Sequence, residues 1–209
     1  MKILLADDHA MFRDSLKALL EREGFEVVAE ASDGREAIRL TRRLNPDLAI
    51  VDLGMPVLNG IGAAREIRKR CLNTKTILLT MFEEEAYVLG ALQAGVRGYV
   101  LKAQAAADLV RAIQEVSHGS IYLSPGISRA VVDAFLNKKT NFKEDPLTER
   151  ERQVLQLIAE GKSTKEVAQI LGVSFKTAES HRMRIMGKLD LHNTAGLVRY
   201  AVRRGLVQA

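Results

Sequence analysis

The first 118 residues alternate short apolar runs with longer amphipathic stretches, and this alternation limits the choice of fold more than any other feature. In residues 11–20, for example, Phe12, Leu16 and Leu20 fall on one face of a helix. The short apolar runs have strand length and lie at residues 2–6, 25–31, 48–51, 76–80 and 98–100. Strands that alternate with helices are typical of a parallel sheet covered on both faces. We therefore expect an α/β domain with a doubly wound, five-stranded parallel sheet.

The pattern changes after residue 118. Residues 119–145 are rich in polar and turn-forming residues and predict a linker, with a short helix at about residues 128–136. Residues 146–209 show helical periodicity only, so they predict a second, smaller all-α domain. Start signals for its helices are the capping-box pairs Thr148 with Glu151 and Ser163 with Glu166, then Ser174, then Asn193 or Thr194.

Charge is distributed unevenly along the chain. Residues 1–120 carry 16 basic and 17 acidic side chains, whereas residues 121–209 carry 15 basic and 9 acidic ones. A nearly neutral first part and a basic second part predict a control module joined to a module that binds anions. A solvated basic surface explains the same excess equally well, so the charge alone does not decide between these interpretations.

Membrane insertion and secretion are not indicated by the sequence. Its longest apolar run is shorter than a membrane-spanning helix, and the apolar start of the chain is too short for a signal peptide. The single cysteine, Cys71, excludes an internal disulfide and suits a reducing compartment. We therefore expect a cytoplasmic protein without membrane contacts.

Polar side chains follow the predicted strands at their carboxyl ends, where open parallel sheets bind ligands. Asp7 and Asp8 follow the first strand and Asp52 the third, while Thr80 and Lys102 follow the fourth and fifth. Three carboxylates at one edge repel one another unless a cation neutralises them, although the first pair could simply cap the next helix. Oxygen ligands without a His or Cys cluster favour Mg²⁺ over Zn²⁺. A cation, a lysine and a hydroxyl together predict a phosphoryl-binding site.

Four sequence blocks lie around these residues: "LLADDHA", "AIVDLGMPVLNG", "ILLT" and "GYVLK". In this order and spacing, over residues 1–118, they resemble the receiver domain of two-component response regulators. The resemblance implies a CheY-like, flavodoxin-like fold. It also implies that Asp52 is the phosphoacceptor, which takes a phosphoryl group from the phosphohistidine of a sensor histidine kinase.

The same resemblance implies a magnesium site. Asp8 and Asp52, with the backbone carbonyl of Gly54, would bind Mg²⁺, and Asp7 would act close by, in part through water. Gly54 departs from the common pattern, because many receivers have a polar or charged side chain at this position. The lifetime of the phosphorylated state is therefore not predicted.

Phosphoryl oxygens would be bound by Lys102 and Thr80, according to this resemblance. Tyr99 occupies the position of the family's aromatic switch and would rotate inward as Thr80 moves. Phe82 is a second flanking position where many receivers are polar or charged. Ala103 follows Lys102 where many receivers have proline, so we expect no cis peptide bond there.

Residues 147–189 predict two helices, a tight turn and a third helix. Gly172 suits the left-handed end of the helix that precedes the turn. In residues 175–189, Ala178 and Ile185 define an apolar side, and a polar stripe lies opposite. Such a helix fits the major groove of DNA, although a four-helix protein-binding domain remains an alternative.

The blocks "LTERE", "GKSTKEVA", "LGVS" and "KTAESHRMRIMGKL" resemble the LuxR-type helix-turn-helix of NarL/FixJ-class regulators, over residues 146–207. The resemblance implies that residues 175–189 are the recognition helix, and that residues 194–203 form a dimer contact through Leu197, Val198 and Val202. The predicted DNA-binding residues are Lys176, Thr177, Glu179, Ser180, Met183, Arg184 and Lys188. Among them, Glu179, Ser180 and Met183 would contact base edges.

Together the two resemblances imply a NarL/FixJ-type response regulator that is not an enzyme. Phosphorylation of Asp52 would control homodimerisation and sequence-specific binding to double-stranded promoter DNA, and hence transcription. One alternative is an aspartate-based phosphatase, but such enzymes usually carry a second carboxylate two residues after the nucleophile, where this chain has Gly54. The other is a constitutive DNA binder with a silent receiver, which the complete set of Asp8, Asp52, Thr80 and Lys102 argues against.

Overall fold

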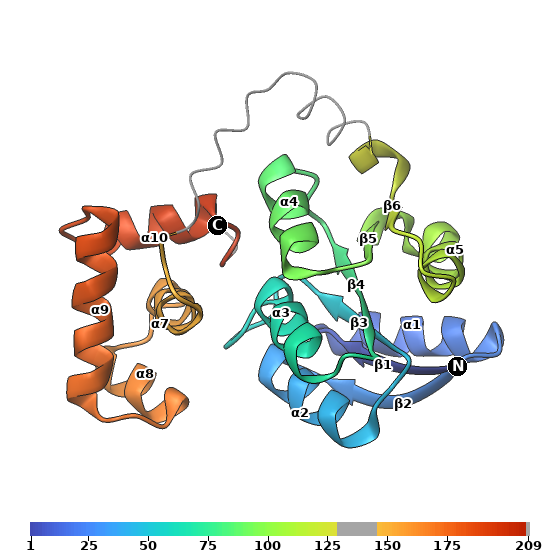
Figure 1. Ribbon diagram of the computed structural model, residues 1–209, viewed down its shortest axis with the longest axis horizontal. Helices are drawn as coiled ribbons and strands as arrows, with labels where there is room; N and C mark the ends of the chain where they lie inside the picture. The colour runs from blue at the N-terminus through green and yellow to red at the C-terminus, as the bar shows by residue number, and fades with distance from the viewer. Residues whose placement is uncertain (129–145, 208–209) are drawn as a thin grey trace. The chain divides into compact units, whose positions relative to one another are not determined.

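The computed structural model describes residues 1–128 and 146–207. These residues form two compact units, which we call the sheet unit (residues 1–128) and the helical unit (residues 146–207). Figure 1 draws the sheet unit in blue to yellow and the helical unit in orange to red. In these two ranges, no helix is both long and apolar enough to cross a membrane.

A parallel sheet of six strands forms the centre of the sheet unit. The order across the sheet is β2-β1-β3-β4-β5-β6. The chain therefore winds outward in both directions from the boundary between β1 and β3, which is where such sheets bind ligands. The strands are β1 (Lys2–Ala6), β2 (Glu26–Ala31), β3 (Leu48–Asp52), β4 (Lys75–Thr80), β5 (Gly98–Leu101) and β6 (Tyr122–Leu123).

The predicted number of five strands is wrong, because β6 extends the sheet beyond β5. The backbone amide of Tyr122 donates to the carbonyl of Arg97, and that of Ser124 donates to the carbonyl of Tyr99. Two residues are too few to produce a periodic pattern, so no strand is predicted here from the sequence. β6 also lies within residues 119–145, the segment predicted as a linker.

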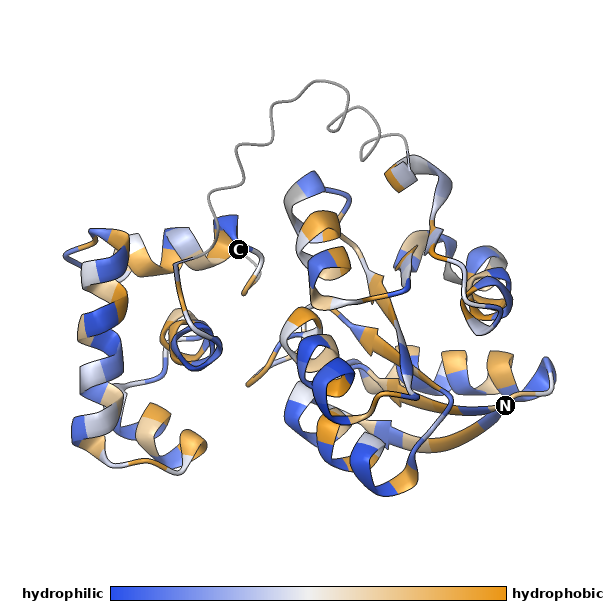
Figure 2. Ribbon diagram, in the orientation of Figure 1, coloured by the Kyte–Doolittle hydropathy of each residue, from blue (hydrophilic) through white to orange (hydrophobic). Residues whose placement is uncertain are grey.

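Helices cover both faces of the sheet, and two apolar clusters lie beneath them. Side chains alternate along each strand, so Leu4 belongs to one cluster and Leu5 to the other. Helices α2, α3 and α4 pack on the first face, and α1 and α5 pack on the second. Their bounds are α1 (Ala10–Arg22), α2 (Gly34–Leu44), α3 (Gly60–Arg70), α4 (Glu85–Ala94) and α5 (Ala105–Ser117). This layering confirms the doubly wound α/β prediction, and Figure 2 shows the hydrophobic strands enclosed by it.

The chain continues from β6 into a helical stretch at residues 125–128. The short helix predicted at about residues 128–136 lies almost entirely outside the described residues, as does most of the polar segment that follows it. The predicted boundary between the sheet unit and a linker stays a prediction.

Four helices make up the described part of the helical unit: α7 (Glu149–Ala159), α8 (Thr164–Leu171), α9 (Phe175–Leu189) and α10 (Thr194–Arg203). The predicted caps are confirmed. Thr148 and Ser163 each form a capping box, and Asn193 rather than Thr194 accepts the capping hydrogen bond at α10. Gly172 ends α8 with φ +63°, a left-handed conformation that glycine adopts without strain.

A compact apolar core joins the four helices. Val154 and Leu155 of α7 pack there with Ala178 and Ile185 of α9, so the predicted apolar side of the third helix is confirmed. Leu197 of α10 is also fully buried in this core. Its side chain therefore faces its own unit, and the α10 residues from the predicted dimer contact that keep some exposure are Val198 and Val202.

Candidate metal centre and nucleic-acid interface

Three carboxylates and an imidazole meet at the carboxyl ends of β1 and β3. Asp7, Asp8, His9 and Asp52 each place a ligand atom within 4.8 Å of the other three. They meet because β1 and β3 are hydrogen-bonded parallel neighbours, with Ala6 paired to Val51, so both strands end at one edge. Asp7 and Asp52 are buried, whereas Asp8 and His9 are exposed.

Lys102 faces the two buried carboxylates. It begins the 3-10 turn η1 (Lys102–Gln104) directly after β5. Its Nζ lies 2.8 Å from Asp7 Oδ2 and 3.1 Å from Asp52 Oδ1, and 4.8 Å from the centre of the Phe12 ring. The lysine thus offsets part of the negative charge at the place where the sequence predicts that it binds an anion.

The surroundings of Asp52 disfavour the ionised form of its carboxyl group. Burial raises the pKa of the Asp52 carboxyl, and the charge of Asp7 raises it further. The ammonium of Lys102 and the backbone amide of Gly54 act in the opposite direction without cancelling the effect. The fold therefore holds this carboxylate at a free-energy cost, which is common at functional sites.

Two buried oxygens of the cluster lack hydrogen-bond partners within the described residues. They are Asp52 Oδ2 and Asp7 Oδ2, the latter an ion-pair neighbour of Lys102 without hydrogen-bond geometry. Buried polar atoms are nearly always satisfied in native proteins. Hard oxygen donors left open beside Asp8 fit a divalent cation of the magnesium type.

His9 is part of this cluster although the sequence indicated no chemistry for it. Its Nδ1 lies 2.9 Å from Asp8 Oδ1 and 3.3 Å from Asp7 Oδ1, and its backbone amide donates to Asp7 Oδ1 at 2.9 Å. Its position directly after Asp7 and Asp8 in the sequence is the feature that could have indicated its place in the cluster.

Thr80 and Tyr99 form a chain of contacts beside the carboxylate edge. Thr80 is fully buried at the end of β4, and its Oγ1 accepts a hydrogen bond from the Phe82 amide at 3.1 Å. The buried Tyr99 hydroxyl donates to the Phe82 carbonyl at 3.0 Å. The Phe82 ring stacks on Tyr87 with centroids 4.7 Å apart. Phe82 therefore connects the predicted switch residues Thr80 and Tyr99 to α4.

The loop after β3 has an unusual backbone at Val57. This residue has φ +69°, and the Leu58 amide donates to the Pro56 carbonyl at 2.7 Å across it. A β-branched residue in this conformation is strained. The described residues contain no cis peptide bond, so the expectation for Ala103 is confirmed.

The predicted DNA-binding residues lie on α9 opposite its buried side. Lys176, Glu179, Met183 and Arg184 are exposed, and Ser180 is half-buried. These residues share a surface that extends along the helix, and Met183 is 69% exposed. Such a mixed polar and basic stripe suits contacts with bases and phosphates.

Two predicted DNA contacts are already engaged within the helical unit. Lys188 Nζ donates to Glu151 Oε2 at 2.7 Å. The Thr177 amide donates to Ser174 Oγ at 3.1 Å, and the two hydroxyls lie 2.8 Å apart. Both residues stay near the surface of α9, but neither side chain is free of internal partners.

Buried polar groups anchor α9, and sequence reasoning did not identify them. Glu151 of α7 is buried, and burial acts to raise the pKa of its carboxyl. Hydrogen bonds from Lys188 and Thr148 outweigh burial and lower that pKa. Burial, with the nearby charges of Arg150 and Arg184, lowers the pKa of His181. Periodicity identifies a helix face but not a partner 37 residues away.

Comparison with known proteins places both units in families. Residues 3–114 match the response regulator receiver domain, and residues 145–201 match the luxR family of bacterial regulatory proteins. The transcriptional regulatory protein MctR of Rhizobium johnstonii is 36% identical over 208 residues, covering 99% of this chain and 95% of that protein. The oxygen regulatory protein NreC of Staphylococcus carnosus is 38% identical over 215 residues, covering 99% of each.

Solved structures agree. A LuxR-family two-component response regulator from Aurantimonas sp. SI85-9A1 is 38% identical with a TM-score of 0.62, over 65% of this chain and 97% of that one. The response regulator RcsB in complex with DNA is 30% identical with a TM-score of 0.60, over 96% of each chain. The protein therefore belongs to the response regulators that join a receiver domain to a LuxR-type DNA-binding domain.

Proposed function

We propose that phosphorylation of Asp52 by a sensor histidine kinase controls DNA binding by α9, and thereby transcription in the cytoplasm. One observation carries the proposal. Asp52 is a buried carboxylate at the end of β3, flanked by two other carboxylates and a lysine, and its Oδ2 has no hydrogen-bond partner in the described ranges. A buried, open oxygen in an acidic pocket suits a nucleophile toward phosphorus.

In the proposed reaction, an ionised oxygen of Asp52 forms the new bond to phosphorus as the bond between phosphorus and the donor histidine nitrogen breaks. Lys102, which now pairs with Asp52 and Asp7, would shift toward the incoming phosphoryl oxygens. Asp8 and Asp52, with the Gly54 carbonyl and Asp7 close by, are the groups that would hold Mg²⁺. When bound, this ion supplies positive charge that favours the ionised carboxylate and offsets the charge of the phosphoryl group.

Transmission of the signal would begin at Thr80. Its hydroxyl now accepts from the Phe82 amide. A phosphoryl group on Asp52 would attract this hydroxyl as a donor, and the Phe82 amide would lose its acceptor. Because the Tyr99 hydroxyl holds the Phe82 carbonyl, residues 81–84 and Tyr99 would move together.

DNA recognition would use the exposed stripe of α9. Glu179, Ser180 and Met183 would contact base edges, and Lys176 and Arg184 would contact phosphates. Thr177 and Lys188 would contact DNA only if their side chains left their present partners, Ser174 and Glu151. Two copies, paired through the exposed parts of Val198 and Val202 on α10, would bind two half-sites of promoter DNA.

The first test is intact mass after incubation with acetyl phosphate and Mg²⁺. We expect wild type to gain one phosphoryl group, about 80 Da, and Asp52→Asn to gain none. Because some receivers accept only from a kinase, a negative result is followed by a competent sensor kinase. No gain from either donor would refute the role of Asp52.

The second test measures DNA affinity with and without phosphodonor. We expect phosphorylation to change the affinity of wild type and leave Asp52→Asn unchanged. Arg184→Gln should weaken binding to all sequences and flatten its salt dependence, whereas Ser180→Ala should alter sequence preference. Affinity that is identical in both states would indicate a constitutive DNA binder with a silent receiver.

A further inference from the structure

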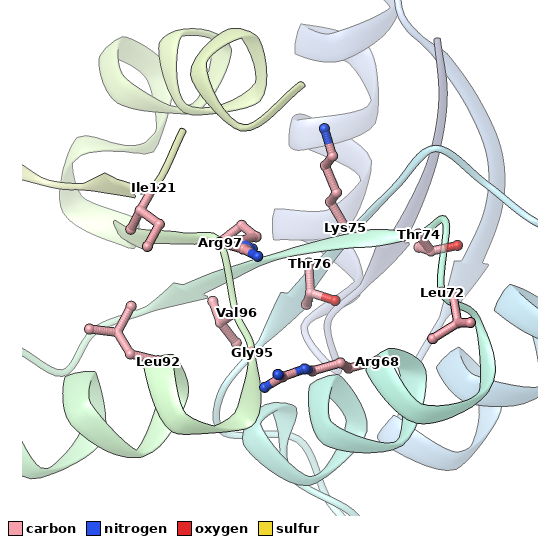
Figure 3. A pocket seen from close by; sticks show the side chains of 10 residues that line it. All are labelled: Arg68, Leu72, Thr74, Lys75, Thr76, Leu92, Gly95, Val96, Arg97 and Ile121. Carbon is pink, nitrogen blue, oxygen red and sulfur yellow. The ribbon is translucent and has the colours of Figure 1, made fainter. Parts of the chain in front are cut away.

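A hollow lies at the edge of the sheet opposite the carboxylates. It has a volume of about 530 Å³ and opens between the ends of α3 and α4, at the starts of β4 and β5. This volume falls within the range of about 300–1,000 Å³ typical of small-molecule sites. Figure 3 shows side chains from α3, α4, β4 and the segment before β6 around it.

Every charged side chain that lines this hollow is basic: Arg68, Lys75 and Arg97. Lys75 is already used, because its Nζ donates to the carbonyls of Val116 at 3.0 Å and Ser117 at 2.8 Å. Arg97 makes no side-chain hydrogen bond or ion pair with the residues that the structure describes. Arg97 is exposed, so its positive charge at the rim of the hollow is available to a ligand.

Arg68 is positioned across the turn between α4 and β5 rather than along its own helix. Its guanidinium has only a long contact, 3.5 Å, with the Gln93 carbonyl. It lies against Gly95, where a Cβ would overlap the Arg68 side chain. Gly95 has φ +93° and ends α4, so the turn needs glycine for its conformation. Arg68 is exposed and also lies in the last turn of α3, where a positive charge is favourable.

Thr76 adds a hydroxyl to the wall of the hollow. The residue is 4% exposed, and it lines the hollow. Figure 3 shows this hydroxyl pointing toward the side on which Arg68 lies. A hydroxyl in this wall can donate a hydrogen bond to an oxygen of a ligand.

Most of the remaining lining is apolar, and two of its side chains are exposed. Leu72 is 86% exposed and Ile121 53% exposed, whereas Leu92 is half-buried and Val96 is buried. A ligand that satisfied only the arginines would leave this surface in water. An aliphatic chain attached to the anion would cover it and gain hydrophobic free energy.

We propose that this hollow binds a small amphipathic anion, a carboxylate or phosphate monoester with a short aliphatic chain. Arg68 and Arg97 bind the anionic group, the Thr76 hydroxyl donates to it, and Leu72 and Ile121 cover the chain. Arginine is suited to this role because its planar donors match carboxylate and phosphate oxygens. The site does not depend on phosphorylation of Asp52, so the two proposals can fail separately.

The test is a titration of the isotope-labelled full-length protein, followed by amide NMR. The probes are hexanoate, hexyl phosphate, inorganic phosphate and hexanol. We expect hexanoate or hexyl phosphate to shift amides around Gly95, Arg97 and Ile121. Inorganic phosphate, without a chain, and hexanol, without a charge, should each bind at least about tenfold more weakly.

Arg68→Gln and Arg97→Gln should each weaken binding of the better probe about tenfold or more, since each removes a charged hydrogen bond. Arg43→Gln, on α2 and outside the hollow, is the matched control and should leave affinity unchanged. Thr76→Val tests the hydroxyl with little change in shape. The proposal is overturned if the shifts centre elsewhere, if neither arginine variant weakens binding, if hexanol binds as tightly, or if no organic anion binds.

Discussion

Replacing Glu151 by alanine should destabilise the helical unit more than any exposed substitution in it. Its Oε2 accepts hydrogen bonds from the Thr148 amide at 2.7 Å and from Lys188 Nζ at 2.7 Å. The first closes the capping box of α7, and the second joins α7 to α9 across 37 residues of sequence. One buried carboxylate therefore fixes both the start of a helix and the position of the proposed recognition helix.

The magnitude follows from these two contacts. Loss of a cap costs about 1 kcal/mol. A hydrogen bond to a charged group contributes about 1.5–3 kcal/mol, and we take the lower end because the Lys188 side chain, 37% exposed, regains water. Glu151→Ala should therefore lower the free energy of unfolding by about 2–2.5 kcal/mol. Glu151→Gln keeps an acceptor for Thr148 and should lose about half as much.

The assay is urea denaturation followed by hydrogen exchange and mass spectrometry of the full chain. Peptides from α7 to α9 report the helical unit, and peptides from the strands serve as an internal reference. With a slope near 1 kcal/mol per molar urea for a unit of this size, the midpoint of Glu151→Ala should fall by about 2 M. Glu179→Gln, an exposed change on α9, is the control.

The pH dependence of the stability difference between wild type and the Glu151 variants gives an independent test. The pKa of Glu151 is lowered in the folded state, so its contribution is present above its ordinary value of 4.5 and disappears as pH falls through the folded-state pKa. The difference between wild type and Glu151→Gln should therefore close in acid. A midpoint shift no larger than that of Glu179→Gln, or a difference that persists in acid, would refute the reasoning.

Three further substitutions test the sheet unit. Gly60→Ala should destabilise it by about 2–3 kcal/mol, because a Cβ would overlap the Asp52 carbonyl oxygen; an unchanged urea midpoint would contradict this. Tyr99→Phe removes the hydrogen bond to Phe82, about 1 kcal/mol, and should speed amide exchange in residues 81–84; equal exchange would count against the contact. Lys102→Met leaves Asp52 buried without its cation, a loss of about 3–5 kcal/mol at neutral pH. Since the pKa of Asp52 is raised, this loss should shrink as pH falls, and a loss independent of pH would rule out an electrostatic origin.

Much of the candidate site was predictable because strand ends are predictable. Once a parallel sheet is recognised, residues such as Asp7 and Asp52 must meet, since neighbouring parallel strands end at one edge. The same holds for helix starts, where Thr148 and Asn193 are local signals for local hydrogen bonds. These predictions succeeded because each depends on residues close in sequence or on one rule of topology.

Other features depend on contacts that no local pattern records. β6 consists of two residues that are strand-like only because β5 offers unpaired backbone groups. Val57 takes a left-handed conformation that its side chain disfavours, so the surrounding loop must impose it. Lys188 was expected to face DNA, yet a buried carboxylate from another helix binds it.

The two open oxygens at Asp7 and Asp52 show how the sheet unit can respond to its ligands. Each unsatisfied buried acceptor lowers the stability of the folded state by about 1–3 kcal/mol. The burial of apolar side chains on both faces of the sheet offsets this cost. A cation that coordinates these oxygens in the folded state alone would stabilise that state. These oxygens lie near Thr80. The Thr80 hydroxyl accepts a hydrogen bond from the amide of Phe82, which belongs to the loop before α4. In the proposed mechanism, occupancy of the carboxylate edge changes the position of this loop through that hydrogen bond, and the loop carries the effect of phosphorylation to the rest of the sheet unit.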